Sequence, residues 1–144
     1  MTPRNFALII GIAYLVAGVL GFVPALLRPA PESAPHVGVT AFYGYLLGLF
    51  AVNLLHDAVH LAIGAWGISA ARTATGARTY AKTLAVFYGT LAVLGLIPGL
   101  NTLFGLVPIH GHDVWLHAAT ALAAAYFGWA WKGTESSLPR ATAH

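Results

Sequence analysis

The sequence contains no cysteine and very few charged residues. Of its 144 residues, only 8% are Asp, Glu, Lys or Arg, whereas soluble domains carry about 25%. The absence of cysteine excludes disulfide bonds, zinc–thiolate sites and thiol nucleophiles. The scarcity of charge leaves too little polar surface for a globule in water, and 58% of the residues are hydrophobic. We therefore predict one integral membrane domain that spans residues 1–144.

Functions that depend on abundant charge are disfavoured as well. Lys and Arg together number only 7 and are scattered along the chain, so no basic patch indicates nucleic acid, and the expected partner is the lipid bilayer. The sequence shows no glycine-rich phosphate loop, Ser–His–Asp order or paired carboxylates that would indicate a reaction. Whether the protein is an enzyme therefore stays open, as do a homodimer and membership of a larger membrane complex.

Four apolar stretches are long enough to cross a bilayer, which takes about 20 residues each. The stretch 37–71 would be about 52 Å long as one straight helix, against an apolar bilayer core of about 30 Å. We expect it to break near Gly44, Gly48 or Asn53, with an interfacial or re-entrant segment at 37–48. The predicted spans are 6–27, 49–71, 79–100 and 108–132.

The basic residues predict the orientation of these spans. Arg28 lies in the first predicted loop, and the others lie at the N-terminus, in the second loop or near the C-terminus. The positive-inside rule then places both termini in the cytoplasm. The first apolar run is too long for the core of a signal peptide, so we expect it to be retained as a span. The polar tail 133–144 is expected to be loose.

The two halves of the chain resemble each other. The segment YLVAGVLGFVP at 14–24 matches YGTLAVLGLIP at 88–98, and GLFAVNLLHDAVH at 48–60 matches GLVPIHGHDVWLH at 105–117. Each half contributes two spans, so the halves have the same orientation in the membrane. We predict an all-α, polytopic four-helix bundle, built from two tandem two-helix repeats that are related by a pseudo-two-fold axis along the membrane normal.

Two stripes of polar residues lie within the apolar spans, where ionisable side chains usually mark a function. Each residue of a helix turns by about 100°, so the members of each stripe share one helix face. Both stripes enter from the outer side, and the pseudo-axis would make them face each other. The stripes are Asn53, His56 and His60 in the second span, and His110, Asp113 and His117 in the fourth.

These stripes predict a metal site in the outer leaflet. His56 and His60 have a spacing that places both imidazoles on one side of a helix, and Asp113 and His117 add a carboxylate and a third imidazole. His110 is a further candidate ligand. Nitrogen and oxygen ligands without cysteine suit zinc, iron or copper as divalent ions. The role of such an ion could be redox, catalytic or structural.

Other uses of the same residues remain open. His60 and His117, which the repeat relates, could hold haem b between two helices, or one of them could ligate a chlorophyll. Without a cofactor, the histidines could form a proton relay or pH sensor, or a hydrogen-bonded plug that fixes helix register. Around the site, Asn53 is peripheral, Asp57 could orient a ligand imidazole, and Trp115 could form a wall or belong to the interfacial aromatic belt.

The second and fourth predicted spans resemble a known family. Residues 48–67, GLFAVNLLHDAVHLAIGAWG, follow the pattern GLF-x-VN-x-x-HN-x-VHL-x-x-G-x-x-G, and residues 113–117 follow D-x-x-LH. The chain is similar here to the small bacterial four-helix membrane proteins of domain-of-unknown-function family 4383. The resemblance covers nearly the whole chain, and it implies a bundle in the bacterial inner membrane without an established activity. Asp57 stands where Asn is common, which weakens any role that depends on its charge.

Overall fold

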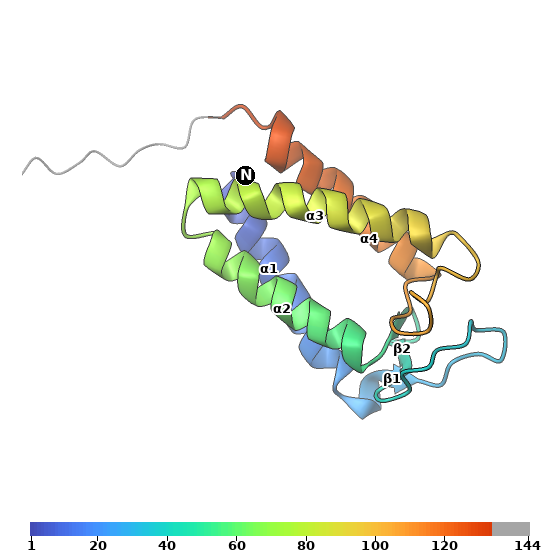
Figure 1. Ribbon diagram of the computed structural model, residues 1–144. Helices are drawn as coiled ribbons and strands as arrows, with labels where there is room; N and C mark the ends of the chain where they lie inside the picture. The colour runs from blue at the N-terminus through green and yellow to red at the C-terminus, as the bar shows by residue number, and fades with distance from the viewer. Residues whose placement is uncertain (134–144) are drawn as a thin grey trace, which may run out of the picture.

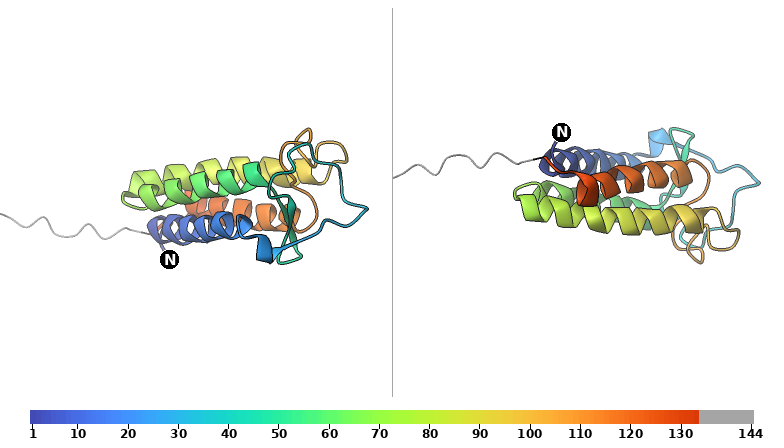
Figure 2. Two further views of the ribbon diagram at one scale, coloured as in Figure 1. Left: turned by 90° about the horizontal axis from the view of Figure 1, so that it is seen from below. Right: turned by 90° about the horizontal axis from the view of Figure 1, so that it is seen from above.

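The computed structural model describes residues 1–133 and shows a mostly helical protein with four α-helices, in agreement with the all-α part of the predicted fold class. Successive helices run antiparallel, and α2 and α3 form one layer over a second layer made by α1 and α4 (Figures 1 and 2). The last helix continues without a break into a π-helical turn, η2. The bounds are α1 Pro3–Gly21, α2 Leu54–Ala70, α3 Ala74–Gly95, α4 His112–Ala125 and η2 Tyr126–Ala130.

The helices begin where the sequence supplies a cap. The hydroxyl of Thr2 accepts a hydrogen bond from the Asn5 N–H at 3.2 Å, and that of Thr73 accepts one from the Gly76 N–H at 3.0 Å. Such side chains satisfy N–H groups that have no partner inside the helix. Helix α4 instead follows Gly111, whose φ of 67° suits glycine. The structure therefore starts α3 before the predicted span at 79 and α4 after the predicted start at 108.

A small antiparallel sheet lies at one end of the bundle, although the sequence analysis predicted no strand. It follows the 3₁₀ turn η1 (Pro24–Leu26) and has the order β1-β2-β3. Leu47 and Gly48, both with positive φ, lie between β2 and β3 and reverse the chain. Because this hairpin takes up residues 44–52, α2 begins at Leu54 rather than at 49. The strands are β1 Leu27–Arg28, β2 Gly44–Leu46 and β3 Phe50–Val52.

Asn53 joins this end of the molecule to α2. Its side-chain oxygen accepts a hydrogen bond from the His56 N–H at 3.0 Å and so caps the helix. Its amide nitrogen donates to the carbonyl oxygens of Val39, at 3.0 Å, and Leu106, at 2.8 Å. Val39 and Leu106 lie in the two long connections, before β2 and before α4. One fully buried amide therefore fixes the start of α2 and both connections.

The opposite end is held by basic residues that bind the ends of neighbouring helices. The Arg4 guanidinium donates to the carbonyl oxygen of Ala71 at the end of α2, at 2.9 Å. That of Arg78 donates to the Trp131 carbonyl oxygen after η2, at 3.2 Å. Cations near the last carbonyls of a helix also complement its dipole. The N-terminus, the α2–α3 turn and η2 thus gather at one end (Figure 1).

Small residues let α1 and α2 approach closely. An added Cβ at Gly64 would lie 2.6 Å from the Leu15 nitrogen and 2.7 Å from the Gly11 oxygen. Glycine at such positions permits close helix packing. By length and hydropathy, one helix of the described chain, α1, could cross a membrane. The main hydrophobic core is Phe6, Ala7, Tyr14, Ile63, Ala70, Ala71, Ala77, Tyr80, Ala81, Leu84, Tyr88, Ala124 and Phe127.

The α1–α2 contact predicts a contrast between two glycines. We expect Gly64→Ala to destabilise the protein by about 1–3 kcal/mol, the usual effect of forcing atoms into a filled interface. Gly89→Ala is the matched control, because its Cβ would meet only Ala121, at 3.9 Å, and alanine favours helix by about 1 kcal/mol. Thermal unfolding followed by circular dichroism measures both. Equal melting temperatures for the two variants would contradict the packing described.

Substitutions of Asn53 separate its two roles. In Asn53→Ser the hydroxyl keeps the helix cap but the amide donors are lost, and two buried carbonyl oxygens lose their partner at about 1–3 kcal/mol. Asn53→Ala also loses the cap, which adds about 1 kcal/mol. We therefore expect the order of thermal stability to be wild type, then Asn53→Ser, then Asn53→Ala. Faster amide hydrogen exchange at residues 37–40 and 102–107 in both variants is the second measurement. Unchanged exchange there would argue against the tether.

Candidate metal site

Three buried imidazoles meet inside the bundle. His56 and His60 come from α2 and His117 comes from α4, and one potential ligand atom from each lies within 4.8 Å of the other two. The exposed fractions of these side chains are 2%, 5% and 1%. The two His residues of α2 share a face because they are four positions apart. The structure thus brings together His56, His60 and His117 in one group.

The backbone of β3 sets the orientation of His56. Its Nδ1 lies 3.0 Å from the carbonyl oxygen of Ala51. A carbonyl oxygen only accepts hydrogen bonds, so Nδ1 carries the proton and Nε2 keeps its lone pair free for a ligand. A ligand histidine usually makes such a bond to an outer partner. The side-chain spacing in the sequence could not reveal this partner, because it is a backbone group of an unpredicted strand.

Neither ring nitrogen of His60 or His117 has a hydrogen-bond partner within residues 1–133. A buried polar group in this state costs free energy unless something binds it. The rings lie instead against tyrosines: Tyr14 is 5.0 Å from His60 and Tyr88 is 4.9 Å from His117, measured between ring centroids. The two tyrosines stack on each other at 5.1 Å. Sequence analysis missed both, although Tyr14 and Tyr88 stand at matching positions of the two similar segments 14–24 and 88–98.

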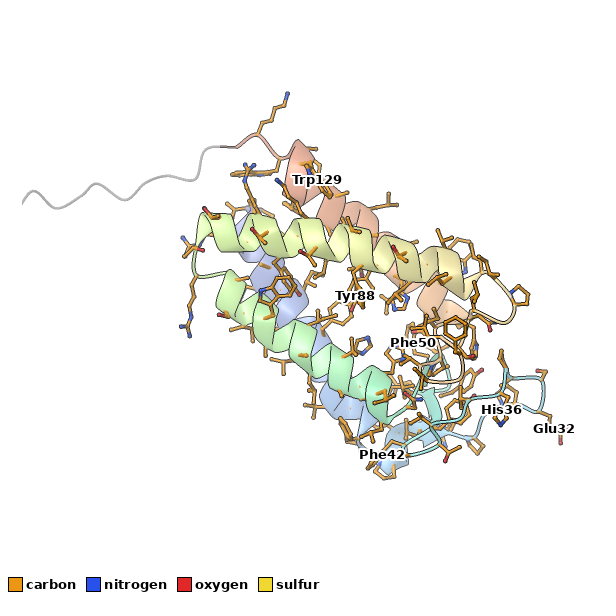
Figure 3. The ribbon with its side chains drawn as sticks, in the orientation of Figure 1. Glu32, His36, Phe42, Phe50, Tyr88 and Trp129 are labelled. Carbon is orange, nitrogen blue, oxygen red and sulfur yellow. The ribbon has the colours of Figure 1, made fainter. Side chains whose placement is uncertain are left out.

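A small cavity adjoins the three imidazoles. Its volume is about 80 Å³, and it is bounded on other sides by apolar residues of α2, α3 and the connection before α4. The side chain of Tyr88, which lines it, points from α3 into the interior (Figure 3). A ligand bound to the imidazoles would therefore face a hydrophobic space. The remaining lining residues are Val59, Phe87, Leu91, Leu103, Val107 and Ile109.

Asp113 and His110 are not members of the three-histidine group. Asp113 lies one helical turn before His117 and is 1% exposed, and its Oδ2 has no hydrogen-bond partner in the described chain. His110 precedes α4 and lies near Tyr45, with 6.2 Å between ring centroids. Burial raises the pKa of Tyr45, so its hydroxyl stays protonated. The two residues thus lie at the start of α4, on the side of the group nearer the sheet.

Asp57 and Trp115 occupy other surroundings. The Asp57 carboxylate packs against Gly21 of α1 and is fully buried, and neither of its oxygens has a hydrogen-bond partner among the described residues. Asp57 therefore faces α1. The role expected for Asp57, that of orienting a histidine ring, is filled instead by the Ala51 carbonyl oxygen. Trp115 is 71% exposed and points away from the cavity. Of the two positions considered for Trp115, a wall of the site or the surface, the structure shows the surface.

The geometry of the group can hold a metal ion. In a tetrahedral site with metal–nitrogen bonds of about 2.0–2.1 Å, the ligand nitrogens lie about 3.3 Å apart. The observed limit of 4.8 Å means that the rings need to close by about 1.5 Å or less. Three imidazoles without a fourth protein ligand resemble catalytic sites, which keep one position open, more than closed structural sites.

Comparison with known proteins identifies the family of the chain. The sequence profile of the family described as "Domain of unknown function (DUF4383)" matches residues 4–130. No curated protein and no solved structure matches the chain. The match spans all four helices and includes every member of the histidine group. The chain therefore belongs to the DUF4383 family.

Proposed function

We propose that this protein is a small membrane protein that binds one divalent transition-metal ion through His56, His60 and His117. The proposal rests on a single observation: three buried imidazoles converge within 4.8 Å, and four of their six ring nitrogens have no hydrogen-bond partner in residues 1–133. Zinc, iron and copper all suit such a ligand set. All three histidines line the cavity, so an ion held by them would be available to an external ligand.

Charge balance supports a dication at this place. A bare dication in an apolar interior is costly unless negative charge lies close by. Asp113 lies one turn before the ligand His117 and its carboxyl group is buried, whereas the carboxyl group of Asp57 packs against Gly21 of α1. Ionised, Asp113 would offset part of the charge of one divalent ion. We therefore assign Asp113 to the surroundings of the ion, where it stabilises charge without completing the ligand set.

The helix surfaces support a place in the bacterial inner membrane. In residues 1–133, the charged helix residues that reach the surface are Arg4, Arg78 and Lys82, all in the half of the bundle that contains the N-terminus. The exposed surface beyond them is largely apolar, the reverse of a soluble bundle. Helix α3 is about 33 Å long, enough for the apolar core. Exposed apolar residues include Leu8, Ile9, Ile12, Val16, Val19, Leu55, Val59, Val86, Phe87, Val93, Leu116 and Leu122.

The proposed tandem duplication is supported by contacts near the site. Tyr14 and Tyr88 correspond in the two halves, as do His60 and His117. Tyr14 contacts His60 in the first half as Tyr88 contacts His117 in the second, at 5.0 and 4.9 Å. The tyrosines themselves stack at 5.1 Å. A pseudo-two-fold axis between the two tyrosines would relate these pairs, and the metal would lie close to it.

The space available favours an ion over a tetrapyrrole. A haem between His60 and His117 would need a flat slot for the whole macrocycle. The cavity at these residues is about 80 Å³, and the ring of His56 lies 4.4 Å from that of His60, between centroids. A third imidazole in this position would obstruct a porphyrin but completes the ligand set of a single ion.

Metal content tests the proposal directly. We expect about one zinc, iron or copper ion per purified chain, and loss of that ion in His60→Ala and in His117→Ala, because each removes a ligand. His36→Ala and His112→Ala are matched controls, since both residues are exposed. Elemental analysis and calorimetric titration are the measurements. An unchanged metal content in both ligand variants would refute the site.

Asp113→Asn tests the position of the carboxylate. Loss of an outer partner usually weakens metal binding about 10–100-fold and leaves the ligand number unchanged. We therefore expect one ion per chain with weaker affinity, and an unchanged number of nitrogen ligands by X-ray absorption spectroscopy. Complete loss of the ion would instead make Asp113 a direct ligand.

The absence of cysteine makes the membrane orientation easy to test. Single-cysteine variants Ser33→Cys, in the connection before β2, and Thr75→Cys, at the start of α3, both lie at exposed positions. The positive-inside rule places position 33 outside and position 75 inside. A membrane-impermeant maleimide should label Ser33→Cys in intact spheroplasts, and Thr75→Cys only after permeabilisation. Labelling of both before permeabilisation would contradict the orientation.

A further inference from the structure

An apolar cleft runs between α2 and α3, away from the histidine group. Its volume is about 250 Å³. Helices α2 and α3 diverge from their connecting turn (Figure 1), and the cleft lies between them. Trp66 and Phe87, at its edge, are 40% and 39% exposed, so the cleft opens to the surface of the bundle. The lining residues are Val59, Ala62, Ile63, Trp66, Thr83, Leu84 and Phe87.

This cleft lies next to the cavity at the proposed metal site, and the path considered below passes between the residues that both spaces share. Val59 and Phe87 line both spaces. From His56 to Trp66, α2 rises by about 15 Å, which gives the length of the combined path. One end of the path is formed by imidazole nitrogens that lack hydrogen-bond partners in the described chain, and the remainder is apolar. The path therefore has a polar end and a hydrophobic body.

The route from the end of the bundle that carries the sheet is covered. Leu103, Val107 and Ile109 line the cavity on this side, and the Asn53 amide fixes their connection through the Leu106 carbonyl oxygen. Leu103 has a φ of 45°, a strained conformation that persists when surrounding contacts hold it. The open side of the path lies between α2 and α3, where the neighbouring exposed residues are apolar.

We propose that the path binds one amphiphilic molecule from the bilayer, with its oxygen-donor head on the metal and its single acyl or isoprenoid chain in the cleft. This inference rests on the proposed metal site. The buried hydroxyl of Tyr88 lines the cavity and has no hydrogen-bond partner within residues 1–133, so it can donate to an oxygen of the head. The polar end thus offers both a Lewis acid and a hydrogen-bond donor.

The size of the path favours a single chain over a helix from another protein. A helix about 10 Å across would need more than about 1,000 Å³ over the same 15 Å. The cleft offers about 250 Å³ and the cavity about 80 Å³. A linear hydrocarbon chain fits such a narrow space and gains free energy with each methylene that it buries. A second copy of this chain could cover the cleft only from outside.

Alkyl hydroxamates test the proposal, because they bind metals through oxygen and can be made with any chain length. The protein would be loaded with cobalt(II) in lipid nanodiscs, and binding followed through the visible cobalt spectrum. Each buried methylene should tighten binding by up to about fourfold. The probe also partitions into the lipid, to the same extent for every variant. Comparing two variants of one helix therefore removes this contribution from the measured affinities. Ala62→Trp fills the cleft, whereas Ala65→Trp adds the same ring at an exposed position outside it.

We expect dodecanohydroxamate to bind Ala62→Trp at least about tenfold more weakly than Ala65→Trp, which corresponds to two buried methylenes. Acetohydroxamate should bind both equally, because it reaches only the metal. Ala62→Leu, a smaller change, should give an intermediate effect if Ala62→Trp does not fold. Equal binding of the long probe to all variants would refute the cleft while leaving the metal site intact. Failure of the wild type to bind cobalt would refute the metal site itself, and this inference with it.

Discussion

The desolvation of three imidazoles is the constraint on which this structure depends. His56, His60 and His117 are almost completely buried, and burial removes the water that would bind their nitrogens. Within residues 1–133, the hydrogen bond to these rings is that of His56 with the Ala51 carbonyl oxygen, and neither nitrogen of His60 or His117 has a partner. A protein that keeps such groups inside an apolar bundle loses stability unless they bind something. This imbalance connects the local geometry to the function that we propose.

Much of the architecture serves to place these rings. The hairpin of β2 and β3 brings the Ala51 carbonyl oxygen to His56, and Asn53 starts α2 directly after it. Because Ala51 lies on the edge strand of the sheet, its carbonyl is free of the interstrand ladder on that side. Beneath the rings, the stacked pair Tyr14 and Tyr88 fixes the distance between α1 and α3. Helix, strand and aromatic contacts thus converge on one small volume.

Sequence reasoning predicted four helical segments, the family and the facing pair His60 and His117, because apolar run length and helical periodicity are local signals. It did not predict the sheet, whose strands are two or three residues long and lie inside an apolar run. Helix ends depended on caps such as Thr73, which moved the start of α3. The exclusion of Asp113 and His110 from the histidine group required knowledge of the tertiary structure, as did the position of Asp57 against Gly21. Periodicity gives the direction of a side chain but not what it meets.

The two hydrogen bonds from the Asn53 amide have a consequence for how the end of the bundle that carries the sheet can open. They hold both long connections over the same end of the bundle, so neither connection can lift alone without leaving a buried carbonyl unsatisfied. Opening of the bundle at this end therefore requires both connections to move together, whereas the cleft between α2 and α3 needs no such movement.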